Sequence, residues 1–103
     1  MLLVREVMFC KPGKVRAMVE KSLAMAKLME KSGQGTMRVL TDVASERYWM
    51  AVMEFETKSM QQFDDMMSGR GQSEQDAKEF ENIMKGYHDL VDYGRREIYK
   101  IEG

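Results

Sequence analysis

The segment from residue 47 to residue 55, Arg-Tyr-Trp-Met-Ala-Val-Met-Glu-Phe, constrains the fold more than any other part of the chain. Alternate residues of a strand point to opposite faces, and here both faces are apolar until Glu54 is reached. One face carries Trp49, Ala51, Met53 and Phe55, and the other carries Tyr48, Met50 and Val52. We therefore expect an interior strand of a sheet that is covered on both sides, because an uncovered side would form a large apolar patch.

Three further elements precede this strand. Residues 2–10 are rich in β-forming side chains and are predicted to form a strand. Residues 13–32 place apolar side chains at i, i+3, i+4 and i+7 and most charges elsewhere, which predicts an amphipathic helix that ends at Gly33. Residues 36–43 alternate between apolar and polar side chains, which is typical of a half-buried strand.

The second half of the chain contains two helix-start signals and a last strand. Ser59 followed by Gln62 has the pattern of a capping box and predicts a short helix. Ser73 is the predicted N-cap of a longer helix that runs to about His88, and residues 93–101 are predicted to form a strand. The side chains expected to face inward from this region are Ala77, Phe80, Ile83, Met84, Tyr87 and Val91.

The resulting order is strand, helix, strand, strand, helix, strand, which predicts an α+β domain of the ferredoxin-like class over residues 1–103. Right-handed crossovers place both helices on one face of a four-stranded antiparallel sheet. The helices leave the second face of the sheet uncovered, so we expect a copy of the same chain to pack against it in a two-fold homodimer.

Charge and cysteine content exclude several classes of protein. The chain has 16 basic and 17 acidic residues and a net charge of −1, which argues against partners that are nucleic acids or anionic membranes. No apolar run approaches the length needed to cross a bilayer. The opening residues carry charge too early for a signal peptide, and the lone cysteine, Cys10, fits a reducing compartment, so a cytoplasmic location is expected.

The first strand is followed by Lys11-Pro12-Gly13-Lys14, which opens the first helix, and this arrangement resembles the dimeric α+β barrel superfamily. It is most similar to NIPSNAP-like and antibiotic-biosynthesis-monooxygenase-like domains. The resemblance implies a homodimer with a cavity between sheet and helices, in which relatives bind small apolar or aromatic molecules. Haem-degrading relatives combine an asparagine, a tryptophan and a histidine, whereas the first strand here offers no asparagine, which argues against haem degradation.

Five side chains are the candidate ligand contacts, and no residue set has the pattern of a catalytic signature. His88, the one histidine, is a general base in one interpretation and a solvated helix-end cation in the other. A single histidine and a single cysteine cannot form a structural zinc site, and no cofactor is implied. The candidates are Tyr48, Trp49, Met53, Tyr87 and His88.

The two adjacent charged residues of the predicted first strand also have two possible interpretations. Arg5 and Glu6 are adjacent, so one of them must face a covered layer and needs a partner there. The partner is predicted among Glu54, Arg95, Arg96 and Glu97. Such a pair is either a polar anchor inside the cavity or an ion pair at the dimer seam, and both interpretations remain open.

Two functions therefore remain at this point. The first is a homodimer that binds a small apolar or aromatic molecule, with cofactor-independent monooxygenase-like chemistry as one form of it. The second is a module without enzymatic activity that dimerises or binds a partner through its sheet. A cavity with a polar end would favour the first, and a cavity filled by methionine and aromatic side chains would favour the second.

Overall fold

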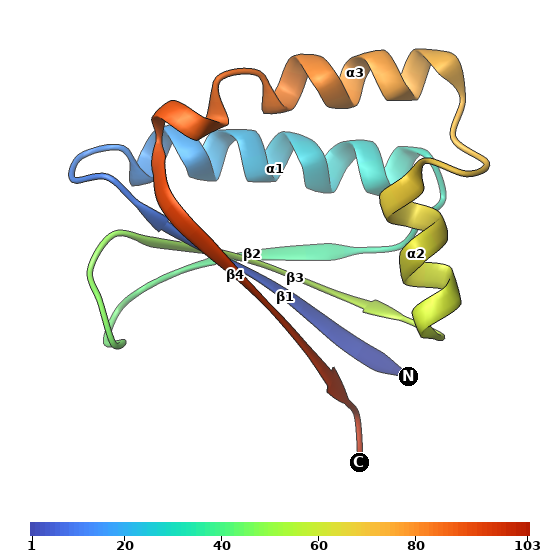
Figure 1. Ribbon diagram of the computed structural model, residues 1–103, viewed down its shortest axis with the longest axis horizontal. Coiled ribbons are helices and arrows are strands. Elements are labelled where there is room, and N and C mark those ends of the chain that lie inside the picture. The colour runs from blue at the N-terminus through green and yellow to red at the C-terminus, as the bar shows by residue number, and fades with distance from the viewer.

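The computed structural model covers residues 1–103 and has the predicted ferredoxin-like α+β architecture. Its antiparallel four-stranded sheet has the order β2-β3-β1-β4, and α1 and α3 lie side by side on one side of it (Figure 1). The elements are β1 (Leu2–Cys10), α1 (Val15–Lys31), β2 (Met37–Thr41), β3 (Met50–Thr57), α2 (Met60–Ser68), α3 (Glu74–Met84), a 3-10 turn (Tyr87–Asp89) and β4 (Val91–Lys100). None of the helices is both long and apolar enough to cross a bilayer.

The third strand starts three residues later than predicted, and this corrects the placement of Tyr48 and Trp49. Trp49 has a φ of 66°, a left-handed conformation that interrupts the alternation of a strand. The turn is held from both sides, because Cys10 N–H donates to Trp49 O (2.8 Å) and Met50 N–H donates to Asp42 Oδ1 (2.8 Å). Both rings therefore belong to the loop after β2, and Tyr48 is 82% exposed. The apolar strand itself, from Met50 to Phe55, is buried throughout as expected.

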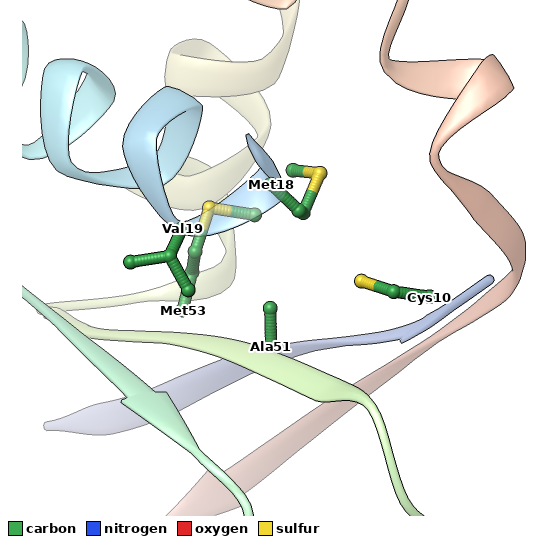
Figure 2. Packing of buried hydrophobic residues seen from close by; sticks show 5 residues of the cluster. All are labelled: Cys10, Met18, Val19, Ala51 and Met53. Atoms are coloured by element: carbon green, nitrogen blue, oxygen red, sulfur yellow. The ribbon is translucent and has the colours of Figure 1, made fainter. Parts of the chain in front are cut away.

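Helix α1 packs tightly on the β2–β3 half of the sheet. Figure 2 shows Met18 and Val19 of α1 meeting Ala51 and Met53 of β3, with Cys10 of β1 beside them. The helix ends as predicted: Gly33 N–H donates to Glu30 O and Gln34 N–H donates to Met29 O, a pattern that requires the left-handed conformation of Gly33.

The second long helix is shorter than predicted. Both predicted N-caps are confirmed, because Ser59 Oγ accepts from Gln62 N–H and Ser73 Oγ accepts from Asp76 N–H. However, α3 ends at Met84, since Gly86 turns the chain with a φ of 81°, and Val91 is the first residue of β4. The expected inward face of α3 does point toward the sheet, because Ala77, Phe80 and Met84 line the space beneath it, but no residue of α3 is fully buried, so α3 covers a less filled space than α1 does.

We call the side of the sheet away from the helices the open face. Its centre is an apolar cluster of Val7, Phe9, Met50 and Val52, which is buried within the single chain. Tyr93 stacks on Phe9 with ring centroids 4.5 Å apart, and the guanidinium of Arg47 lies 5.1 Å from the Phe9 centroid. The chain thus covers the centre of this face with its own side chains, whereas a partner subunit had been expected to do so.

Candidate functional site

The two halves of the helix-facing side of the sheet carry different side chains. On the β2–β3 half, Met53 and Phe55 belong to buried apolar clusters that include side chains of α1. On the β1–β4 half, the register pairs Glu6 with Arg96 and Met8 with Gly94. A charged pair and a glycine offer little apolar surface for a helix to bury, and α3 accordingly packs against α1 instead of the strands.

A cavity of about 480 Å³ lies beneath α3, and its floor extends from Glu6, Met8 and Arg96 on this half of the sheet to Met53 and Phe55 on the other half. Its volume lies within the range of small-molecule sites. Most of its wall is apolar, and methionine is the dominant residue type. The eight methionines that line it are Met8, Met25, Met29, Met37, Met53, Met66, Met67 and Met84.

Helix α3 and the turn after it close the cavity from above, through Ala77, Phe80 and Tyr87. Two lysines of α1 hold the helix. Lys31 Nζ lies 2.9 Å from Glu79 Oε2 in the middle of α3, and Lys21 Nζ donates to Ile83 O (2.9 Å) and Lys85 O (2.7 Å) at its C-terminal end. Together with the packing of Met84 against the α1 cluster, these tethers hold α3 in place above the cavity.

Glu6 and Arg96 form the polar end of the cavity. Arg96 Nε donates to Glu6 Oε1, and Arg96 Nη2 contacts Met67 Sδ at 3.7 Å. The guanidinium also lies over the Phe63 ring, 5.0 Å from its centroid, which fixes its plane. The carboxylate of Glu6 is 16% exposed and the Arg96 side chain 47%, so the pair stands between the apolar wall and solvent.

Arg5 takes the other predicted position, on the open face. Its Nε lies 3.2 Å from Glu54 Oε2, an ion-pair distance without hydrogen-bonding geometry, and its Nη1 lies 3.4 Å from Glu97 Oε1. Glu54 also pairs with Arg38, which compensates the burial of its carboxylate. Of the two charges of the first strand, Glu6 thus lies in the cavity and Arg5 forms a cross-strand ion pair on the open face.

The candidate residues from the sequence fall into two groups. Met53 and Tyr87 line the cavity, whereas Tyr48 and Trp49 line a separate hollow in the loop from Asp42 to Trp49. His88 is exposed and its ring lies 4.0 Å from that of Tyr87, outside the cavity wall. Sequence reasoning placed Phe80 on the inward face without assigning it to a site, and it did not name Met66 or Met67, for which the one signal was the unusual abundance of methionine.

Cys10 lies within the α1 cluster, where it is buried. Burial raises the pKa of its thiol above 9.0, with Asp42 and Asp92 acting in the same direction and a hydrogen bond from the backbone of Ala51 opposing them. The thiol is therefore protonated at neutral pH and is a poor nucleophile. No three histidine, cysteine, aspartate or glutamate side chains come together in a way that could hold a metal ion.

No protein-family model matches the sequence, and no curated protein matches it either. Solved structures do match the fold. A NIPSNAP domain protein from Burkholderia xenovorans superposes with a TM-score of 0.77 at 8% identity, over 100% of this chain and 96% of the other. A NIPSNAP family protein from Agrobacterium tumefaciens gives a TM-score of 0.75 at 7% identity, over 97% and 92%.

The chain has the fold of these NIPSNAP proteins. An antibiotic biosynthesis monooxygenase shares it, with a TM-score of 0.62 at 15% identity over the whole of both chains. The resemblance read from the sequence is thus confirmed at the level of fold. At these identities the likeness concerns the backbone, and the chemistry of the site rests on this chain's own residues.

Proposed function

We propose that this chain binds a small apolar or aromatic molecule in the cavity between the sheet and α3. The observation that carries the proposal is a space of about 480 Å³ with an apolar wall and one polar end, the combination that marks small-molecule sites. A purely structural module would gain stability by filling this space, because every unfilled methylene position in a core costs packing energy. An antibiotic biosynthesis monooxygenase has the same fold, which is consistent with a small-molecule site in this fold and leaves the reaction unassigned.

Methionine suits such a wall because its side chain is unbranched and polarisable and repacks around different shapes. Met53 from the sheet and Tyr87 from the turn after α3 are the sequence-derived candidates that we retain as ligand contacts. Tyr48, Trp49 and His88 lie outside the cavity and are not part of this proposal. The buried lone thiol of Cys10 supports a reducing, cytoplasmic setting.

The cavity can be tested by filling it. Ala77 lines it from α3, and the neighbouring Lys78 is exposed and does not. With the uncharged probe N-phenyl-1-naphthylamine, whose fluorescence rises in apolar surroundings, we expect binding to the native chain. Ala77→Trp should weaken it at least tenfold, and Lys78→Trp should leave it within twofold. Absence of probe binding, or equal binding by both variants, would contradict the proposal.

The same chain is proposed to act as a homodimer through the open face. Although the centre of this face is covered, Leu40, Tyr93 and Tyr99 remain exposed around it by 37%, 51% and 49%. Alternating charges, Arg38, Glu54, Arg5 and Glu97, cross the face from β2 to β4, and such a row can pair with a rotated copy of itself.

Native mass spectrometry at micromolar concentration tests the dimer. The dimer should be lost in Leu40→Glu and kept in Val43→Glu, which adds the same charge at a fully exposed loop position. A native chain that stays monomeric, or a Leu40→Glu variant that still dimerises, would contradict the assembly but not the cavity.

A further inference from the structure

The charges around the cavity are unequal, and this limits what it can hold. Two carboxylates, Glu6 and Glu81, line it together with a single guanidinium, that of Arg96. The remaining polar side chains in the wall, Gln34, Ser68 and Gln72, carry no charge. A ligand with an ionised carboxylate would meet repulsion from Glu6 at short range, because Glu6 shares the polar end with Arg96.

The geometry of the pair also leaves hydrogen-bonding capacity for a ligand. Arg96 uses Nε for Glu6 and Nη2 for Met67, so Nη1 has no partner in the protein. Glu6 uses Oε1, so Oε2 has none. The second oxygen of Glu6 is therefore an acceptor at the cavity wall, and the stacking of Arg96 on Phe63 holds the paired guanidinium in place.

We propose that the molecule bound here is uncharged, with an apolar ring system and one hydroxyl group that donates to Glu6 Oε2. A hydroxyl group can donate to this carboxylate, whereas an anionic ligand is repelled by it and a hydrocarbon has no donor to offer. The ring system lies along the methionine wall toward Tyr87. This inference rests on the proposed binding function and specifies the class of ligand.

Three compounds of nearly the same size separate the possibilities at pH 7. Naphthalene has no polar group, 2-naphthol is an uncharged hydroxyl compound, and 2-naphthoate is an anion. We expect 2-naphthol to displace N-phenyl-1-naphthylamine at a concentration about tenfold lower than naphthalene, since hydrogen bonds to charged groups are worth about one order of magnitude in affinity. The anion 2-naphthoate should be the weakest competitor.

Glu6→Gln identifies the residue responsible. The variant keeps the size of the side chain but removes the charge, so the advantage of 2-naphthol over naphthalene should fall below threefold and 2-naphthoate should bind more tightly. Asp65→Asn is the matched control, because it removes the same charge from an exposed site on α2 that does not line the cavity. The native ranking should persist in that control.

The results of these competition experiments test the hydroxyl assignment separately from the proposal that the cavity binds a ligand. Equal displacement by naphthol and naphthalene, a preference for naphthoate, or an unchanged ranking in Glu6→Gln would overturn the hydroxyl assignment. If the probe still binds and Ala77→Trp still blocks it, the cavity remains the binding site. If the probe does not bind at all, both proposals fail together.

Discussion

The two crossover helices of this chain lie on the same side of the sheet, but only α1 packs tightly against it. Helix α1 lies on β2 and β3 and buries Met18, Val19 and Met29. Helix α3 lies over β1 and β4, buries nothing fully, and leaves a cavity below it. Both helices are amphipathic, so their sequences alone do not explain the difference.

The difference comes from the strands beneath. Below α1, β3 presents Ala51, Met53 and Phe55, and tight packing removes water from both surfaces. Below α3, the sheet presents Glu6 and Arg96, which lose hydration if a helix is pressed onto them. The layer beneath α1 therefore provides most of the tight packing, whereas the binding space lies beneath α3 and reaches Met53 and Phe55 only at its edge, and three substitutions test this division.

The largest loss of stability is expected for Met18→Ala in the α1 half. Met18 is fully buried in the cluster that joins α1 to the sheet. Truncation of a buried methionine removes packing and leaves a void, so the free energy of unfolding should fall by about 2–5 kcal/mol. Urea denaturation followed by circular dichroism measures the loss, and a value below about 1 kcal/mol would show that this half is not the packed one.

A smaller loss is expected for Phe80→Ala in the α3 half, although phenylalanine is the larger residue. Phe80 is 41% exposed and faces a cavity. It therefore gains only part of the free energy of a buried ring, and its truncation should cost about 1 kcal/mol. The same urea titration applies, and a cost equal to that of Met18→Ala would remove the contrast between the halves.

The smallest effect concerns pH and Cys10, a titratable group inside the packed half. Because burial raises its folded-state pKa above 9.0, the folded chain holds the thiol proton more tightly than the unfolded chain does. This contribution to stability is fully present below pH 9 and is lost as the pH rises through the folded-state pKa. The difference in unfolding free energy between the native chain and Cys10→Ala should therefore decrease from pH 8 to pH 10. A difference that stays constant would show that the thiol is not desolvated.

Much of the fold follows from local patterns. The period of α1, the two serine N-caps and the apolar run from Met50 to Phe55 each depend on side chains within a few residues, and all appear where they were predicted. Trp49 was misplaced because its left-handed backbone depends on a hydrogen bond from Cys10, which lies far away in the sequence, and on the contact of Met50 with Asp42 across the loop. The end of α3 was missed because apolar residues continue at helical spacing past Gly86, although the chain turns at that glycine.

By itself, the sequence determined the order of the elements, the ferredoxin-like class and the need to cover an apolar strand, because periodicity and capping are properties of neighbouring residues. Only the tertiary structure decided that Glu6 meets Arg96, a residue 90 positions away, and that Arg5 meets Glu54 on the opposite face. Strand register makes these pairings, and register depends on the whole sheet. The cavity is a consequence of the same register, since it places a charged pair where α3 would otherwise have packed.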